Sequence, residues 1–286
     1  MSSELEVTYP TLPQPQQVRF DTTTKCNAFC KSCHRFYSHR DGEMPAKLYT
    51  EIIRDLAKWD KPLFQIVPVN YGEFFLYPDW YKLLDLIKRK LPDTSICIPT
   101  NGILVDQEVV AKLASIPNIQ VINFSINAFF EETYAHFTGT SAENLNNIHA
   151  SMMRLKILRP DILIRASMVF DPIYCSDLQR DLFIEYWKSL AEVWILPAAS
   201  ACRGTEIKIL RRIPCRSIFS DFVIGYDGKL SSCCFDAGFT LDLGNLSDFD
   251  GNVLKAWSNP KLDHLRKLHN EHKRQEISLC RGCTFE

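Results

Sequence analysis

From residue 17 to residue 201 the sequence alternates between short apolar segments and longer amphipathic ones, with six apolar segments in all. The short segments read as strands and the long ones as helices, because their apolar residues follow the corresponding spacing. Such an alternation is typical of a parallel sheet joined by helical crossovers. The predicted strands are 18–24, 63–73, 95–102, 119–127, 161–170 and 192–198, and the predicted helices are 45–59, 79–90, 106–116, 141–158 and 177–190.

Polar groups follow four of these strands at the point where each strand ends. The segments are TTTKCNAFCKSC, YGE, TNG and SIN. In a barrel or partial barrel the carboxyl ends of parallel strands meet at one rim, which is where functional residues gather. A doubly wound sheet is the alternative, although no G-x-G-x-x-G motif follows the first strand. Either way, we expect these segments to converge.

Composition and charge exclude several functional classes. The net charge of −1 offers no electrostatic basis for binding nucleic acid. No apolar run reaches the roughly 18–20 residues that span a membrane, and the polar, proline-rich start has no signal-peptide features. We therefore expect a cytoplasmic protein. In that reducing compartment, eleven cysteines indicate metal binding, catalysis or burial rather than disulfides.

The alternation stops near residue 201, and residues 202–286 differ in composition. They hold six of the eleven cysteines, two glycine turns and one clear helix, 259–272, whose basic cluster is predicted to be a solvated face. A segment of this size commonly needs a metal or cluster for stability. The predicted organisation is a flexible lead-in at 1–16, a barrel domain at 17–201 and a small cysteine-rich domain at 202–286.

Three thiols follow the first predicted strand. Cys26, Cys30 and Cys33 have the spacing C-x3-C-x2-C. Three thiolates can hold three corners of a [4Fe–4S] cluster and leave the fourth iron open to another ligand. They would also fit a zinc site completed by the neighbouring His34, or simple burial. The spacing alone leaves these alternatives open.

This spacing, directly after the first strand of a β/α alternation, resembles that of the radical SAM enzymes. NYGEFFLYPDW resembles the family's G-G-E-P segment, PTNG its T-N-G and FSINA its S-I-D/N, in the family's order. In that family the open iron binds S-adenosylmethionine, and reductive cleavage gives a 5′-deoxyadenosyl radical that abstracts a substrate hydrogen atom. The resemblance implies a partial (β/α)6 TIM-like barrel and an electron donor such as flavodoxin or ferredoxin. It also implies that Cys26, Cys30 and Cys33 hold a [4Fe–4S] cluster.

The resemblance further assigns residues to S-adenosylmethionine. The end of the second strand would hold its amino group through backbone carbonyls and a Glu carboxylate, and a guanidinium on the fifth strand would pair with its carboxylate. The fourth strand would contact the ribose or methionine end. The implied contacts are Tyr71, Gly72, Glu73, Asn101, Ser125, Asn127 and Arg165.

The chain departs from the family pattern at three positions. Ser32 stands before the third cysteine, where an aromatic residue is usual. Tyr71 replaces the first Gly of G-G-E-P, and Phe74 replaces its Pro. These changes affect the expected adenine contact and methionine clamp.

The tail resembles the SPASM/twitch domain of the same superfamily. The match lies in its cysteine spacing, its glycine hairpin GYDGK and the stretch LGN. It implies four ligands, Cys215, Cys233, Cys280 and Cys283, for one fully ligated auxiliary [4Fe–4S] cluster, as in single-cluster aminocyclitol dehydrogenases. A zinc ribbon is the alternative for four thiolates.

Four cysteines belong to neither ligand set. Cys97 alternates within an apolar strand and is expected in the core. Cys175 and Cys202 follow the fifth and sixth strands, and Cys234 adjoins a predicted ligand. A rim thiol can donate a hydrogen atom to a substrate radical, so Cys175, Cys202 and Cys234 are candidate donors.

Three functions are open. Family frequency favours modification of a ribosomally made precursor peptide; a separate peptide-recognition protein would deliver it, because only about sixteen residues precede the first strand. The compact chain and single-cluster tail favour dehydrogenation or epimerisation of a small molecule such as an aminocyclitol. The third is a non-catalytic zinc- or cluster-binding protein.

Overall fold

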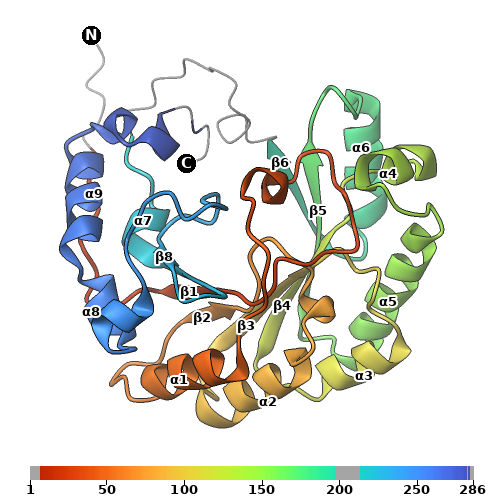
Figure 1. Ribbon diagram of the computed structural model, residues 1–286. Coiled ribbons are helices and arrows are strands. Elements are labelled where there is room, and N and C mark those ends of the chain that lie inside the picture. Colours follow the sequence, from red (N-terminus) through yellow and green to blue (C-terminus); the bar gives the residue numbers. More distant parts are fainter. Residues whose placement is uncertain (1–6, 198–212, 282, 284–286) are drawn as a thin grey trace.

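One curved sheet organises the protein in a computed structural model that describes residues 7–197, 213–281 and 283 (Figure 1). Its strand order is β6-β5-β4-β3-β2-β1-β7-β8. Every neighbouring pair is parallel except β7 and β8, which are antiparallel. The strands are β1 Gln17–Asp21, β2 Gln65–Val67, β3 Ser95–Thr100, β4 Ile119–Ser125, β5 Leu163–Phe170, β6 Glu192–Pro197, β7 Asp221–Gly225 and β8 Leu230–Ser231.

The helices lie mainly on the outer side of this sheet. The α-helices are α1 Ala46–Leu56, α2 Trp80–Lys90, α3 Gln107–Ala114, α4 Glu131–Thr138, α5 Asn144–Leu158, α6 Asp177–Trp187, α7 Ser217–Ser220, α8 Val253–Trp257 and α9 Pro260–Asn270. Short 3₁₀ helices span His34–Tyr37, Phe74–Leu76, Leu246–Phe249, Arg274–Glu276 and Ser278–Cys280. Figure 1 shows α1, α2, α3, α5 and α6 around the outside, and the loop after β1 on the concave side. The predicted α/β partial barrel is confirmed, with an open sheet.

Side-chain alternation explains which face of the sheet is buried. On β4 and β5, Phe124, Ala166 and Met168 point outward into the core beneath the helices and are fully buried. The residues between them, such as Asn123 and Ser167, are polar and face the concave side, where Asn123 Nδ2 donates to Ser167 Oγ at 3.2 Å. The helices therefore cover the apolar face, and the polar face lines the inside of the partial barrel.

The last two strands join the tail to the barrel. β7 pairs in parallel with all five residues of β1, so the C-terminal region extends the same sheet rather than forming a separate one. Part of the predicted lead-in also contacts this region, because Trp257 Nε1 donates to Leu12 O at 2.8 Å and Tyr9 N to Asn270 Oδ1 at 3.0 Å. The predicted boundary at 201/202 lies outside the described residues, and the three-part division stays a prediction.

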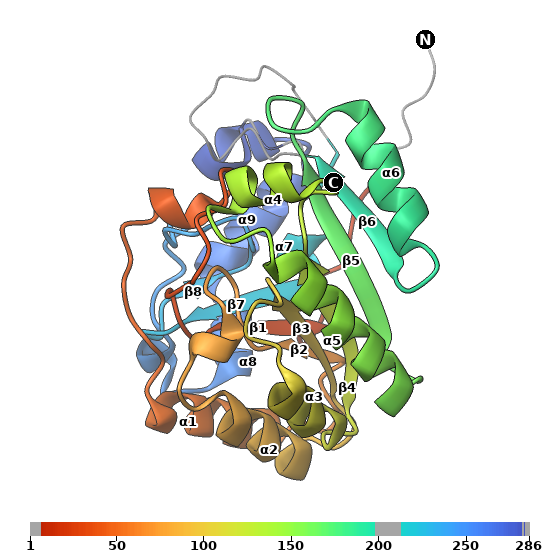
Figure 2. The same ribbon diagram turned by 90° about the vertical axis from the view of Figure 1, so that its right-hand side faces the viewer.

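One helix of the barrel region was not predicted, and in the tail the short helices α7 and α8 were not predicted either. The segment 131–138 has aromatic and acidic residues without a clear apolar stripe, yet it forms α4, which ends at Gly139 in a left-handed conformation (φ 65°). Figure 2 shows α4 above α5, at the same end of the molecule as the loop after β1. Within the described residues, no helix has the length and hydrophobicity to cross a membrane.

Candidate functional site

The three-cysteine loop, residues 26–33, is held at the rim by the end of α4. Phe29 N donates to Thr138 O at 2.6 Å, and Lys31 N donates to Phe137 O at 3.0 Å. Carbonyls in the last turn of a helix have no partner within that helix, so they are available as acceptors. The unpredicted helix α4 therefore fixes the backbone that carries the three thiols.

Arg35 supports the same loop from inside. Its Nη2 donates to Ala28 O at 3.0 Å and its Nη1 to Thr24 O at 3.4 Å. The guanidinium also lies over the Phe36 ring, 4.8 Å from its centroid. A planar donor group of this kind can hold several carbonyls in one arrangement.

The three thiols are half-buried and influence one another. Burial raises the pKa of Cys30 to about 12, with further contributions from Cys33 and Cys26. Burial is also the main cause that raises the pKa of Cys26. Thiols of this kind stay protonated at neutral pH unless a metal displaces the proton, as coordinated iron does. Their residue type and mutual proximity fit the ligands of an iron–sulfur cluster.

Glu73 ties the end of β3 to the segment after β2. Its side chain is buried, and its carboxylate accepts from Thr100 Oγ1 at 2.7 Å, Asn101 N at 2.7 Å and Phe75 N at 3.3 Å. Burial raises the pKa of Glu73, and these hydrogen bonds oppose that rise. Both oxygens accept hydrogen bonds within the protein, and the predicted contact of Glu73 with S-adenosylmethionine stays a prediction.

Gly72 lies where two backbone segments nearly touch. A Cβ atom at this position would stand 2.0 Å from Thr23 O and 2.9 Å from Lys25 O. The next residue donates its backbone N–H to Lys25 O at 2.8 Å. Only glycine permits this approach, so the segment after β2 is positioned directly against the start of the three-cysteine loop.

Asn101 brings the T-N-G segment to the same loop. Its Nδ2 donates to Asn27 Oδ1 at 2.7 Å and lies 3.7 Å from Cys26 Sγ. Its Oδ1 accepts from Ile103 N at 3.0 Å, which fixes the orientation of the amide. The structure therefore places Asn101 beside the first predicted cluster ligand.

Tyr71 links this region to the tail. Its hydroxyl lies 3.4 Å from His34 Nδ1, and the His34 ring packs against Phe235, with 5.5 Å between centroids. His34 is buried, so the residue considered as a fourth zinc ligand lies in a contact between the barrel and the C-terminal region.

Ser125 and Asn127 lie at the rim end of β4. Asn127 has a positive φ of 67°, its Oδ1 accepts from Val169 N at 3.0 Å, and its Nδ2 donates to Ser125 O at 3.3 Å. Its side-chain amide thus stabilises the turn at the end of β4 and joins it to β5. The predicted contact of both residues with S-adenosylmethionine stays a prediction.

Arg165 lies on β5, where it pairs with Asn123 of β4. It is the third residue of β5, two positions before Ser167, which pairs with the rim residue Ser125. Its Nε donates to Glu192 Oε2 at 2.5 Å, and its guanidinium stacks on Trp194 at 3.9 Å. The hydrogen bond from Arg165 lowers the pKa of Glu192. The predicted contact of Arg165 with S-adenosylmethionine stays a prediction.

The structure gathers the four predicted tail ligands, Cys215, Cys233, Cys280 and Cys283. Burial raises the pKa of Cys233 well above its usual range, and Cys234, Cys280 and Cys215 add to that effect. Burial raises the pKa of Cys280 to about 12, with contributions from Cys215 and Cys283. Four half-buried thiols whose charges influence one another in this way have the residue types of a fully ligated cluster.

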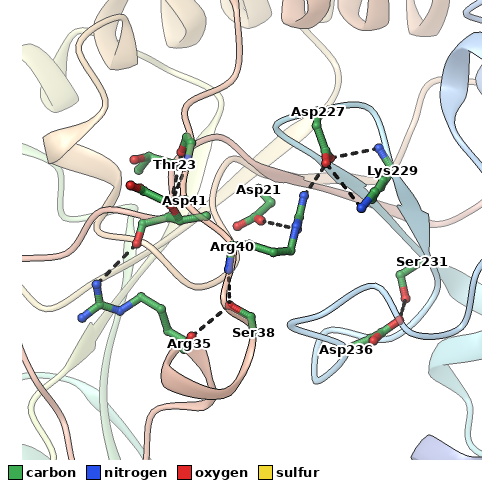
Figure 3. A network of polar contacts seen from close by, with 12 residues as sticks. Asp21, Thr23, Arg35, Ser38, Arg40, Asp41, Asp227, Lys229, Ser231 and Asp236 are labelled. Carbon is green, nitrogen blue, oxygen red and sulfur yellow. Dashed lines mark hydrogen bonds and ion pairs between the residues drawn. The ribbon is translucent and has the colours of Figure 1, made fainter.

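An acidic residue shapes the loop that carries Cys233. Asp236 is buried and accepts from Ser231 Oγ at 2.8 Å, Thr240 N at 2.6 Å and Leu241 N at 3.1 Å. These bonds close the loop after β8, and Figure 3 shows Asp236 facing Ser231. The loop is therefore held by the protein's own hydrogen bonds.

The sequence analysis missed His269. The basic cluster on α9 is not a solvated face throughout, because Arg266 and His269 are almost fully buried. His269 Nδ1 accepts from Cys215 N at 3.0 Å, and its Nε2 lies 3.8 Å from Cys280 Sγ. Burial lowers the pKa of His269 to about 4, and Arg274 adds to the effect. The signal was its helical spacing from Leu262, which lies on the same buried face.

The candidate hydrogen-atom donors differ in placement. Cys175 is buried, with its thiol 3.8 Å from Asn127 O at the rim. Cys234 is half-buried, and the Arg19 charge on β1 opposes the rise that burial causes in its pKa. Cys202 lies outside the described residues. Cys97 is half-buried on β3, and burial raises the pKa of its thiol.

Arg40 connects the barrel to the tail, lying between Asp21 and Asp227 (Figure 3). Its Nη1 donates to Asp21 Oδ2 at 3.2 Å, and its Nη2 donates to Asp227 Oδ1 at 2.7 Å. Its guanidinium lies between the rings of Phe239 and Tyr226, with centroid distances of 4.1 and 4.7 Å. One buried cation thus joins β1 to the turn between β7 and β8.

Among residues 7–197, 213–281 and 283, no group of three or more His, Cys, Asp or Glu side chains is arranged to hold one metal ion. A zinc ion draws its thiolates to about 2.3 Å from one centre, whereas each thiolate of a cubane cluster binds a different iron. The two sets of cluster ligands stay predictions.

Comparison with protein families gives two matches. Residues 20–158 match the model of the radical SAM superfamily, and residues 215–284 match the SPASM iron–sulfur cluster-binding domain. The FeMo cofactor biosynthesis protein NifB of Methanocaldococcus infernus is 28% identical over 125 residues. That match spans 41% of this chain and 41% of the NifB protein.

Solved structures with the same fold cover most of the chain. BtrN in complex with AdoMet and 2-DOIA has a TM-score of 0.65 at 16% identity, and covers 97% of this chain and 94% of its own. Streptococcus suis SuiB bound to precursor peptide SuiA has a TM-score of 0.64 at 16% identity. The match covers 96% of this chain and 70% of the SuiB chain. Native anSMEcpe with bound AdoMet and Cp18Cys peptide has a TM-score of 0.69 at 14% identity, and the match covers 93% of this chain and 88% of the anSMEcpe chain.

Proposed function

The chain belongs to the radical SAM superfamily and carries a C-terminal SPASM domain, and on this premise we propose specific ligands for two clusters. Cys26, Cys30 and Cys33 hold the cluster that binds S-adenosylmethionine. A second cluster in the tail is fully ligated, by Cys215, Cys233, Cys280 and Cys283. Full ligation leaves no iron of the second cluster open, which suits electron transfer rather than substrate binding.

The observation that supports this assignment best is the convergence at the rim. The three-cysteine loop, Gly72 and Asn101 come from the ends of β1, β2 and β3 and meet within hydrogen-bond distance. When bound, the cluster and S-adenosylmethionine supply a 5′-deoxyadenosyl radical that abstracts a hydrogen atom from the substrate. The chain's own residues position this site, since α4, Arg35 and Glu73 fix the loop and its neighbours.

Iron and acid-labile sulfide content tests the two-cluster proposal. After anaerobic purification we expect about eight irons per native chain, and about four in a chain with Ala at Cys26, Cys30 and Cys33, because each cubane cluster holds four. A chain with Ala at Cys215, Cys233, Cys280 and Cys283 should also hold about four. Zinc with little iron in the tail would contradict the auxiliary cluster.

We propose that the substrate is a peptide. We also propose that a separate electron donor such as flavodoxin or ferredoxin supplies the electron. The support is that two of the structural neighbours, SuiB and anSMEcpe, are solved with peptides bound. A separate peptide-recognition protein would be a further partner. The second candidate is a small molecule such as an aminocyclitol, which the near-complete mutual coverage with BtrN supports.

Release of 5′-deoxyadenosine under reducing conditions separates these candidates. We expect release to rise when short precursor-type peptides are added, and not with aminocyclitols. Release that rises with aminocyclitols and not with peptides would favour a small-molecule substrate instead. Iron-loaded protein that never cleaves S-adenosylmethionine would support the non-catalytic alternative.

Cys175, Cys202 and Cys234 remain candidate hydrogen-atom donors for an epimerisation. In that case, replacement of the donor by Ala should leave 5′-deoxyadenosine release intact and change the product. Unchanged product from all three single variants would remove these thiols from the mechanism.

A further inference from the structure

His269 lies between two of the proposed ligands of the tail cluster. The ring sits on the buried face of α9 and is 1% exposed. Its Nδ1 accepts the backbone N–H of Cys215 at 3.0 Å, and its Nε2 lies 3.8 Å from the sulfur of Cys280. Phe219 packs edge-on against the ring, with 6.4 Å between the centroids. Both nitrogens are therefore directed at the cluster-binding segment.

The contact to Cys215 decides which nitrogen carries the proton. A neutral imidazole has one N–H donor and one acceptor nitrogen. Because Nδ1 accepts the Cys215 N–H, the ring proton of His269 lies on Nε2. That nitrogen then faces Cys280 as a donor, and a coordinated thiolate is an acceptor.

We propose that His269 tunes the reduction potential of the auxiliary cluster by donating its Nε2–H to the sulfur of Cys280. This inference rests on the proposed function of the four tail cysteines. Hydrogen bonds to cluster sulfurs are among the factors that set reduction potentials. A donor withdraws electron density from the thiolate, so it stabilises the reduced cluster and raises the potential.

Burial makes the interaction stronger than it would be in water. The ring has almost no contact with solvent, and a hydrogen bond in a low-dielectric interior is electrostatically stronger. The same ring also holds the backbone of Cys215, so its orientation relative to Cys280 is fixed. His269 is thus a positioning residue that acts on the cluster through its ligands.

The test is a redox titration of the auxiliary cluster, followed by EPR, in the full chain with Ala at Cys26, Cys30 and Cys33. We expect His269→Leu to shift the midpoint potential to a more negative value, since the N–H donor is lost. His269→Gln keeps an N–H donor and should stay close to the parent value. His264→Leu, on the exposed side of the same helix, is the matched control and should cause no shift.

A second measurement covers the case in which His269→Leu fails to retain its cluster. With ¹⁵N-labelled histidine in the parent chain, pulsed EPR of the reduced cluster should show a weak nitrogen coupling and an exchangeable proton. The strong coupling of a directly bound nitrogen would overturn the proposal, as would the absence of any coupling or an unchanged potential in His269→Leu. A tail without iron would overturn both this proposal and the proposed function, and iron analysis of the same samples identifies that case.

Discussion

The Arg40→Met variant is expected to unfold with a free energy about 3–5 kcal/mol smaller than that of the native chain at neutral pH. The Arg40 and Asp21 side chains are only 9% and 3% exposed, and their charged atoms are 3.2 Å apart. Removing the cation leaves Asp21 as a buried carboxylate without its partner. It also removes the guanidinium from between Phe239 and Tyr226, so packing between barrel and tail is lost as well.

The loss should depend on pH in a defined direction. Burial raises the pKa of Asp21 to about 6, and Arg40 opposes the rise. A carboxyl whose pKa is higher in the folded chain contributes stability at low pH, and this contribution is lost as the pH rises through the folded pKa. Without Arg40 that pKa rises further, so the variant keeps losing stability above about pH 6, by up to about 1.4 kcal/mol per pH unit. The gap between the two chains should widen from about pH 6 to about pH 8.

Denaturant unfolding at several pH values measures this gap. Arg54→Met, an exposed arginine on α1, is the matched control and should be nearly neutral. Adding Asp21→Asn to Arg40→Met should recover part of the stability and remove the pH dependence. A deficit that is the same at all pH values would show that packing, and not the unpaired carboxylate, causes the loss.

The fold was predictable because it depends on periodicity. Apolar alternation and helical spacing are local properties of the sequence, and they place β1 to β6 and their connecting helices close to where the structure has them. The helix α4 was missed because its buried residues, Tyr134, Phe137 and Thr138, do not form a regular stripe of aliphatic side chains. The extension of the sheet by β7 is a long-range pairing that no local pattern contains.

The site was predictable only where its chemistry is carried by a motif. Cysteine spacing indicates ligands because a cluster requires thiolates, whatever else surrounds them. His269, Arg40 and Asp236 have no such signature, since their roles depend on burial and on partners far away in the sequence. From the sequence alone, a histidine in a basic helix is expected to be exposed to solvent. Only the packing of α9 against α7 and the tail cysteines shows that His269 is buried.

Two residues show how a motif can indicate a place without fixing a contact. Glu73 occurs in the expected segment, and its carboxylate accepts hydrogen bonds from Thr100, Asn101 and Phe75. Arg165 occurs on the expected strand, where it pairs with Glu192 on β6, and its contact with S-adenosylmethionine stays a prediction.

Gly72→Ala is expected to remove the S-adenosylmethionine-binding cluster while leaving the tail cluster in place. The added methyl group would stand 2.0 Å from Thr23 O and 2.9 Å from Lys25 O, both backbone atoms that cannot rotate away. The strand end that leads into the three-cysteine loop must therefore move, and the hydrogen bond from Glu73 N to Lys25 O must lengthen. Overpacking of this kind costs about 1–3 kcal/mol, and here the displacement falls on the loop whose geometry the cluster requires.

Iron content and 5′-deoxyadenosine release measure this effect. In Gly72→Ala the iron content is expected to fall from about eight towards about four per chain, and release is expected to be lost. Gly238→Ala is the control, because a Cβ there would meet only the Thr240 methyl group, at 3.2 Å. It should keep both clusters. Full iron content and normal release in Gly72→Ala would mean that the rim tolerates a shift of the loop, and that the close approach of Gly72 is not what positions the three thiols. Loss of iron from the tail as well would instead show that the barrel and the SPASM domain fold as one unit, as the pairing of β1 with β7 allows.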